Sequence, residues 1–238
     1  MGKNLLLKEY FSNESTSLFN MLFGEVEDLM TLTSTLRKNI TDFILSVGEE
    51  ITDACIHKSA IVDENVYLGN GTVVEPFVYI KGPSIIGSNV TVRKGAYIRE
   101  FSLVDHNCII GSSVEIKESI IMSNTHIPHL SYVGNSIIGN GVLLGAGFKG
   151  SNEKLSQTHG IKIFISEDEF IQTDFKKFGC VVGDKTRVGC NVVVCPGSVI
   201  GREVIVYPSI VIRGFLPHKT IVKLQNNLNI IVERRWEY

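Results

Sequence analysis

The chain has 238 residues, of which 44% are hydrophobic and 20% charged, so it can bury a sizeable core as one domain with a small appendage. Its 23 Lys and Arg residues nearly balance 25 Asp and Glu residues, and the net charge of −2 gives no overall attraction to nucleic acid or anionic membranes. No run of about 18 apolar residues is present, and the N-terminus turns polar too soon for a signal peptide. We therefore expect a cytoplasmic protein with no nucleic-acid or membrane partner.

The cysteines argue against two classes of small-protein architecture. They number five, an odd count, and none forms a CxxC pair. This pattern favours neither a disulfide framework nor a structural zinc site.

The first 50 residues predict an N-terminal helical cap. Apolar residues recur at helical spacing, and Gly48 is a typical stop signal. The residues with this spacing are Leu22, Val26, Leu29, Leu32 and Leu36. Because a repeat protein needs its end coil covered, we expect one or two helices to cap the repeats that follow.

Residues 51–218 carry a six-residue repeat. An apolar residue recurs at every sixth position from Ile56 to Met122, and the pattern resumes from Val182 to Ile212. A period of six matches neither a helix nor a half-buried strand, and it indicates short β segments joined by turns. Such segments stack into a solenoid whose coils lie about 4.8 Å apart. An unbroken period would place Met122 and Pro128 at inward positions.

These hexads resemble those of left-handed parallel β-helix proteins, the hexapeptide acyltransferase superfamily, in which three hexads make one triangular coil. The resemblance implies an all-β fold of that class. Its handedness comes from the resemblance alone, since ordinary crossover connections have the opposite hand. A β-solenoid with a different coil length is the alternative.

Coils of three hexads would stack three cations into a ladder. Lys81, Arg99 and Lys117 are 18 positions apart, and each directly follows an apolar position of the repeat. Like charges on neighbouring strands destabilise a sheet, so the ladder favours a bound anion, with phosphate the natural candidate. On the spacing alone, three side chains that extend separately into solvent remain an equal alternative.

The stretch "IPHLSYVG" breaks the repeat. His126 and Tyr132 replace the usual small residues, and such breaks in an otherwise consistent pattern are often functional. The longer stretch "VEIKESIIMSNTHIPHLSYVGNSIIGNGVLLGAG" resembles the segment around the catalytic histidine of bacterial glucosamine-1-phosphate acetyltransferases. The resemblance is close from Ala96 to Gly147 and looser through "FGCVVGDKTRVGCNVVVCPGSVIG". The nucleotidyltransferase domain of that family has no counterpart here.

The resemblance implies a role for seven residues, a homotrimer with active sites between subunits, and acetyl-CoA as acyl donor. It does not support a role for Lys81. The implied roles are general base for His129, sugar-phosphate contacts for Arg99 and Lys117, a further substrate contact for Tyr132, and positions near acetyl-CoA for Ala146, Asn152 and Cys190.

Two departures from the family concern the acceptor. Leu143 stands where the family has an asparagine that contacts the amino sugar, and "FKGSNEKLSQTHGIKIFISEDEF" replaces the family's segment after GAG. Loss of a polar partner can change specificity strongly. We therefore expect an N-acetyltransferase for a phosphorylated or nucleotide-linked amino sugar. The alternatives are a sugar O-acetyltransferase and a non-catalytic β-helix that binds a sugar nucleotide or serves as a scaffold.

The expected chemistry is direct acyl transfer. A histidine with a pKa near neutrality can accept the proton of the attacking amine, and backbone N–H groups near Gly145–Gly147 could stabilise the oxyanion. No covalent intermediate and no metal are expected. A zinc site made by His57, His106 and His126 is the weaker alternative, because the spacing of these residues does not fit the metal-binding families with this fold.

The remaining segments lie outside the regular hexads. Residues 149–178 contain two strand-like runs, "IKIFIS" and "EFIQT", which predict an ejected hairpin. After Pro217 we expect the hexads to stop and residues 219–238 to form a tail with a terminal strand in "NIIVERRWEY". Arg234 and Trp236 in that strand are candidate interface residues.

Overall fold

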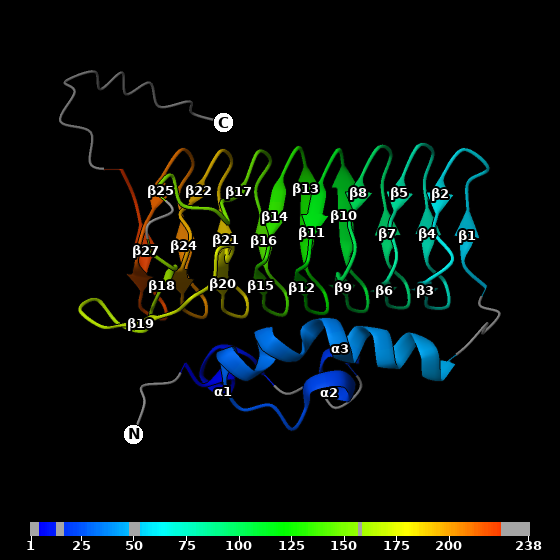
Figure 1. The fold of residues 1–238 in the computed structure, drawn as a ribbon. Coiled ribbons are helices and arrows are strands. Elements are labelled where there is room, and N and C mark those ends of the chain that lie inside the picture. Colours follow the sequence, from blue (N-terminus) through cyan, green and yellow to red (C-terminus); the bar gives the residue numbers. More distant parts are fainter. Residues whose placement is uncertain (1–4, 13–16, 48–52, 157–158, 225–238) are drawn as a thin grey trace, which may run out of the picture.

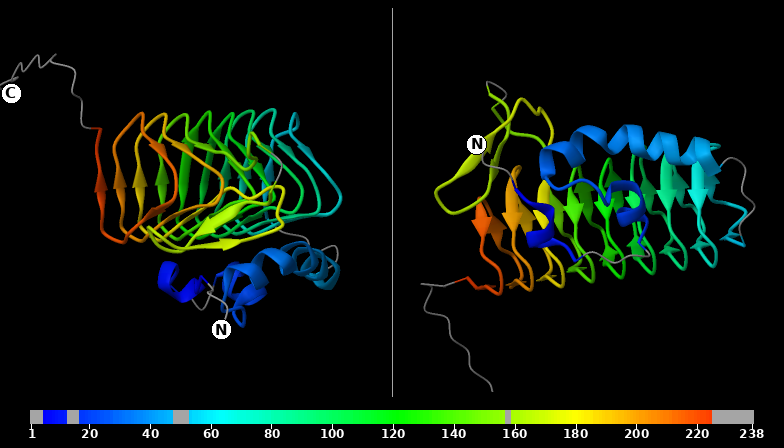
Figure 2. Two further views of the ribbon diagram at one scale, coloured as in Figure 1. Left: turned by 60° about the vertical axis from the view of Figure 1, so that its left-hand side comes forward. Right: turned by 90° about the horizontal axis from the view of Figure 1, so that it is seen from below.

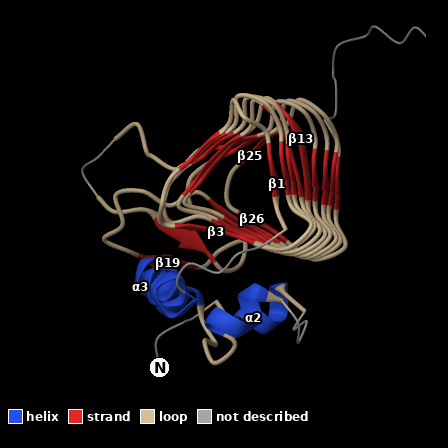
Figure 3. Cartoon of the chain, turned by 90° about the vertical axis from the view of Figure 1, so that its right-hand side faces the viewer, coloured by secondary structure: helices blue, strands red, loops and turns tan. Residues whose placement is uncertain are grey.

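The computed structural model describes residues 5–12, 17–47, 53–156 and 159–224. Its main body is a triangular prism of stacked coils, with the N-terminal helices along one side (Figures 1 and 3). All neighbouring strands within the three large sheets are parallel and lie one coil apart. The expected left-handed parallel β-helix is confirmed.

Each sheet forms one face of the prism, and each complete coil contributes one short strand to each face. Sheet 1 contains β1 (Cys55–Ile56), β4 (Val73–Val74), β7 (Thr91–Val92), β10 (Ile109–Ser112), β13 (His126–His129), β16 (Leu143–Leu144), β21 (Arg187–Val188), β24 (Ile205–Val206) and β27 (Ile221–Val222). Sheet 2 contains β2 (Ile61–Val62), β5 (Tyr79–Ile80), β8 (Tyr97–Ile98), β11 (Glu115–Lys117), β14 (Tyr132–Gly134), β17 (Lys149–Gly150), β22 (Val193–Val194) and β25 (Val211–Ile212). Sheet 3 contains β3 (Val66–Leu68), β6 (Ser84–Ile86), β9 (Leu103–Val104), β12 (Ile120–Ile121), β15 (Ile137–Ile138), β20 (Cys180–Val182), β23 (Ser198–Ile200) and β26 (Phe215–Leu216).

The corners between the sheets are tight turns. The first corner leads from sheet 1 to sheet 2, and the second corner leads from sheet 2 to sheet 3. Many corner residues have positive φ, as in Asn107 (φ 57°) and Asn124 (φ 61°). Asparagine tolerates this left-handed conformation better than most residues, which explains its frequency in the hexads.

The register of the repeat changes inside the coils, first after Lys117, then one coil later and again between β25 and β26, and the sequence predicted none of these changes. Ile121 pairs with Val104 and points into the core, whereas Met122 lies outside the coils against the helices. The first change arises at the second corner, in the turn that directly follows Lys117. There the single left-handed residue Glu118 (φ 45°) makes the turn one residue shorter. The expected inward positions Met122 and Pro128 are therefore wrong, and Ile121 and Ile127 occupy them.

The N-terminal helices lie along sheet 3 instead of covering the end coil, so the expected placement of the cap is wrong (Figure 1). The helices are α1 (Leu7–Tyr10), α2 (Leu18–Phe23) and α3 (Leu29–Val47). The outward residues of sheet 3 are large and apolar, as in Ile85, Leu103 and Ile137, and they form one buried cluster with α3. The 19 residues of α3 give it a length of about 28 Å, enough to cross about six coils.

Two buried carboxylates hold the N-terminal segment against the coils. Asp105 accepts hydrogen bonds from the backbone N–H groups of Leu18 (3.0 Å) and Phe19 (3.1 Å) at the start of α2. Asp184 accepts from both the backbone N–H and the hydroxyl of Ser12, each at 2.6 Å. These charge-assisted bonds fix where the helices lie along the prism.

The chain leaves the coils at the second corner between β17 and β20. There β18 (Lys162–Phe164) and β19 (Phe170–Gln172) pair antiparallel, and the hairpin packs beside sheet 3 (Figure 2). The coils also continue past Pro217, because β27 pairs with β24. The expected end of the hexads at that proline is therefore wrong, and the terminal strand expected in 229–238 lies outside the described residues.

Candidate functional site

Three of the expected site residues lie one above another in the first corner. The backbone N–H of Gly147 donates to the carbonyl of His129 (3.0 Å), and that of Asn191 donates to the carbonyl of Ala146 (2.8 Å). His129, Ala146 and Cys190 therefore occupy the same corner position in three consecutive coils. The side chains of His129 and Cys190 are exposed, and Ala146 is partly buried. A histidine and two small residues thus line one edge of the prism, which we call the histidine edge.

The position of His129 depends on a close contact between β10 and β13. A Cβ atom on Gly111 would lie 1.5 Å from the carbonyl oxygen of Pro128. Only glycine permits this approach, because every other residue would place a carbon atom inside the neighbouring backbone. The contact fixes the residue immediately before His129.

The backbone N–H groups near the GAG motif are mostly committed to the coils. Gly145 donates to Val188 (2.7 Å) and Gly147 to His129, so these two N–H groups cannot also serve an oxyanion. Within the described chain, no acceptor is found for the N–H of Ala146. The expected oxyanion donors therefore reduce to that one group.

The basic ladder is present on sheet 2. Ile80, Ile98 and Ile116 pair in register, so the cations that follow them stack beside the second corner. Lys81 is 3.4 Å from Glu100, and Arg99 is 3.1 Å from Glu115. In the described ranges, by contrast, no ion pair is found for Lys117. Lys117 is thus the ladder residue most available to an added anion.

The surroundings of Lys117 contain more positive charge than the ladder alone supplies. Partial burial lowers the pKa of Lys117, and the nearby charges of Lys177 and Arg99 lower it further, whereas Glu118 and Glu100 oppose the shift. Lys177 comes from the segment that returns to the coils after the hairpin. This segment contains no hexads, so its sequence did not indicate that Lys177 lies close to Lys117.

Lys117 should react with an acylating reagent more slowly when Lys177 is replaced by methionine. Removal of the neighbouring cation raises the pKa of Lys117, so less of its amine is neutral at about pH 8. Labelling rates can be followed by peptide mass spectrometry, with Lys176→Met as a matched control because Lys176 is exposed next to Lys177. Equal rates in the parent protein and in Lys177→Met would contradict the proximity of the two ammonium groups.

Tyr132 lies on sheet 2 between the histidine edge and the ladder. It pairs with Glu115, and its hydroxyl lies beside the side-chain amide of Asn152. A Cβ atom on Gly134 would lie 2.5 Å from the Tyr132 hydroxyl and 2.7 Å from Asn152 Nδ2, so glycine makes room for both groups. Burial raises the pKa of Tyr132, as does the charge of Glu115, whereas the contact with the Asn152 amide opposes the shift.

Asn152 and Lys149 differ from what the sequence suggested. Asn152 is nearly buried beside Tyr132, apart from the histidine edge with which its expected acetyl-CoA role grouped it. Lys149 was not anticipated, although its outward place soon after GAG was a possible signal. Its ammonium donates to the carbonyls of Leu130 (2.6 Å) and Gly147 (3.3 Å), next to the histidine edge.

The other histidines do not form a metal site in the described ranges, where no group of three metal-binding side chains is found. His106 accepts a hydrogen bond from the backbone of Ser88 through Nδ1 (2.9 Å). His126 is half-buried on sheet 1, where it pairs with Leu143, and its pKa is lowered by burial and then by the charges of Arg93 and His129. Its Nε2 atom is buried without a hydrogen-bond partner in the described chain.

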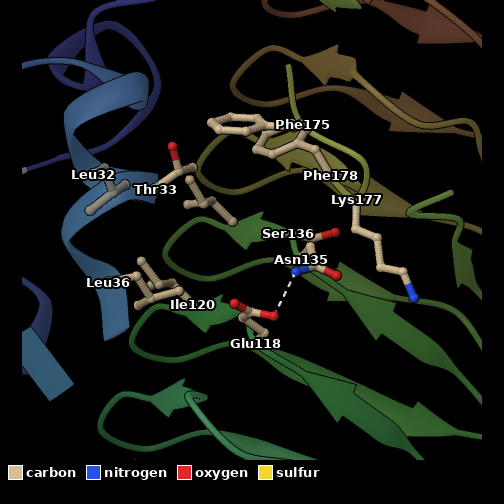
Figure 4. A pocket seen from close by; sticks show the side chains of 11 residues that line it. Leu32, Thr33, Leu36, Glu118, Ile120, Asn135, Ser136, Phe175, Lys177 and Phe178 are labelled. Atoms are coloured by element: carbon tan, nitrogen blue, oxygen red, sulfur yellow. Dashed lines mark hydrogen bonds between the residues drawn. The ribbon is translucent and has the colours of Figure 1, made fainter. Parts of the chain in front are cut away.

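A cavity of about 180 Å³ lies between α3, sheet 3 and the returning segment (Figure 4). Leu32, Leu36 and Phe178 supply apolar walls, and Glu118 and Asn135 lie at its polar side.

None of the described helices is long and apolar enough to cross a bilayer.

Comparison with known proteins gives sequence relatives over most of the chain. The family model of the GMPPB C-terminal domain matches residues 80–155. A bifunctional sugar-1-phosphate nucleotidylyltransferase/acetyltransferase of Sulfurisphaera tokodaii is 37% identical over 97 residues, 41% of this chain and 24% of that protein. The bifunctional protein GlmU of Methanococcus aeolicus is 30% identical over 213 residues, 89% of this chain and 49% of that protein. The chain thus spans at most about half of the length of these relatives.

Among solved structures, a mutant of GDP-perosamine N-acetyltransferase from Caulobacter crescentus, in complex with CoA and GDP-perosamine, is 18% identical. The match covers 82% of this chain and 71% of that one, with a TM-score of 0.32. The stacked hexapeptide coils and the sequence relatives place the chain in the hexapeptide-repeat acyltransferase superfamily.

Proposed function

We propose that the chain is an acetyl-CoA dependent N-acetyltransferase for an amino sugar that carries a phosphate or a nucleotide. One observation carries the proposal. The exposed His129 shares the histidine edge with Ala146 and Cys190, and Tyr132 separates this edge from Lys117, a cation with no ion pair in the described chain. A base and a small-residue edge for the acyl donor thus lie together at the first corner, and an anion site lies across sheet 2 from them.

In this proposal His129 accepts a proton from the attacking amine as the new N–C bond forms. The C–S bond of the thioester then breaks, and the imidazolium returns the proton to the departing thiolate. The N–H of Ala146 and the ammonium of Lys149 lie beside the same edge and can stabilise negative charge on the carbonyl oxygen. No group of the protein is acylated.

The small side chains of Ala146 and Cys190 are compatible with an extended acyl donor along the histidine edge. A bulky residue at either position would project into that path. The acetyl group itself is supported by the Sulfurisphaera relative, whose name describes an acetyltransferase.

We also propose a homotrimer with its active sites between subunits. The outward faces of sheets 1 and 2 are not covered by the described helices, and they expose apolar side chains. Val73 and Ile205 on sheet 1 and Ile61 and Val211 on sheet 2 are exposed by 40–67%. Packing of three prisms would bury such residues.

An O-acetyltransferase is the second candidate, because one observation favours it. Leu143, which replaces the family's asparagine, lies partly buried beside His126 on the sheet that carries His129. An apolar side chain there supplies no partner for an amine or amide of the acceptor. A hydroxyl acceptor would still need the base.

A thiol-release assay with acetyl-CoA tests the proposal. Glucosamine 1-phosphate and UDP-glucosamine serve as amine acceptors, and their N-acetylated forms offer only hydroxyl groups. Turnover of an amine acceptor, with the product confirmed by mass spectrometry, is the expected result. Turnover restricted to the N-acetylated forms would establish the second candidate. No turnover of any of these sugars would favour the non-catalytic scaffold.

A further inference from the structure

A continuous series of side-chain hydrogen bonds runs from α3 to Asn152, which lies beside Tyr132. Arg37 on α3 donates through Nε to Glu118 Oε1 (2.6 Å), and Asn135 donates through Nδ2 to Glu118 Oε2 (3.0 Å; Figure 4). Asn152 Nδ2 donates to Asn135 Oδ1 (2.6 Å), and the same amide lies beside the Tyr132 hydroxyl over Gly134. Glu118 and Asn135 therefore each bond to the residues on both sides of them in the series.

Glu118 and Asn135 are firmly held, so the position of one side chain in the series constrains the next. Both stand at the second corner with positive φ, 45° and 47°, and the backbone N–H of Asn135 donates to the carbonyl of Lys117 (2.8 Å). The Glu118 side chain is 19% exposed, whereas that of Arg37 is 64% exposed. Arg37 also lies with its guanidinium 4.9 Å from the centre of the Phe101 ring. The outer end of the series is thus held on two sides.

The far end of the series has little freedom. Asn152 is 9% exposed, and its carbonyl accepts from the N–H of Phe178 in the returning segment (2.9 Å). Because Gly134 has no side chain, the Asn152 amide and the Tyr132 hydroxyl meet directly over that residue. If the Asn152 amide turns, the contact that lowers the pKa of the Tyr132 hydroxyl is lost.

We propose that Asn135, held by Glu118 and Arg37, is a positioning residue that sets the Tyr132 hydroxyl for the acceptor sugar. Helix α3 is then part of the substrate site as well as a cover for sheet 3. The inference rests on the proposed function, because it takes Tyr132 as an acceptor contact. A purely structural role would fasten α3 to the coils without changing Tyr132.

Two pairs of variants separate these roles. Asn135→Gly removes the amide but tolerates the positive φ of the corner. Arg37→Met removes the outer end of the series, and Lys38→Met is its matched control, since Lys38 is exposed on the same helix and pairs only with Asp42 in the described chain. We expect the KM for the amino-sugar acceptor to rise about tenfold in Asn135→Gly and about threefold in Arg37→Met. The kcat, the KM for acetyl-CoA and all constants of Lys38→Met should stay within about twofold of the parent.

A second readout does not depend on turnover. With 3-fluorotyrosine placed at position 132, the ¹⁹F resonance reports the phenol directly. Asn135→Gly should shift this resonance and raise the pKa of the phenol, because the Asn152 amide that lowers it is no longer held. Lys38→Met should leave the spectrum unchanged.

The outcomes are distinct. A ¹⁹F shift together with a raised acceptor KM supports the inference. An unchanged ¹⁹F titration in Asn135→Gly overturns it, and so does a shift with no change in acceptor KM. If the parent protein turns over no amino sugar, the proposed function fails. In that case the ¹⁹F titration still decides whether the series positions Tyr132.

Discussion

Replacement of His129 with alanine is expected to lower kcat for acetyl transfer by about 10²–10⁴-fold. The imidazole is the only general base in the proposal, and its removal leaves the attacking amine without a proton acceptor. The substitution should not disturb the coils, because the side chain is exposed and only the backbone of His129 bonds to the next coil. Thiol release under saturating conditions measures the effect, and circular dichroism checks the fold.

His57→Ala is a suitable control for this experiment. His57 is an exposed histidine in the first coil, where its ring bonds to the hydroxyl of Ser59 (2.9 Å). Its replacement should leave kcat unchanged within about twofold, since it lies outside the proposed site. If His129→Ala keeps the parental rate, the general-base assignment is lost, although the fold would stand.

Gly111→Ala is expected to have the largest combined effect on stability and activity. The added methyl group would overlap the backbone of Pro128, and rotation of a side chain cannot relieve an overlap between backbones. We expect the free energy of unfolding to fall by about 3 kcal/mol. Displacement of β13 by about 1 Å would also cost about 10²-fold in rate, because His129 directly follows Pro128. Chemical denaturation and thiol release measure the two effects.

Gly150→Ala provides the matched control. Gly150 is also buried, but a Cβ atom there would meet its nearest neighbour, in the ring of Phe148, at 3.4 Å. This is an ordinary contact, so the free energy of unfolding should change by less than about 1 kcal/mol. Similar losses in both variants would show that Gly111 is not needed for the approach of β10 to β13.

The hexad period made much of the coil geometry predictable. Inward residues such as Ile80, Ile98 and Ile116 follow from an apolar position that recurs every six residues, and the stacking of the cations beside them follows from that register. The change of register after Lys117 could not be read in the same way. Ile120, Ile121 and Met122 are all apolar, so the pattern fits either register, and only the length of the corner decides between them.

The family resemblance, and not the six-residue period, singled out His129, Ala146 and Cys190. They fall on one edge because the register changes, since an unbroken period aligns residues 18 apart and His129 stands 17 residues before Ala146. The environment of Asn152 was not predictable, because it depends on where the chain re-enters the coils after the hairpin. The same holds for Lys177, which reaches the neighbourhood of Lys117 from that returning segment.

The sequence by itself determined the stacked coils, since an apolar residue at every sixth position can be buried along its whole length only if short strands turn at regular corners. Only the tertiary structure decided that α3 lies along sheet 3 and that Arg37 joins Glu118 and Asn135. A helical pattern shows which side of a helix is apolar but not which apolar surface it covers. That choice depends on packing between segments far apart in the chain, which no local pattern records.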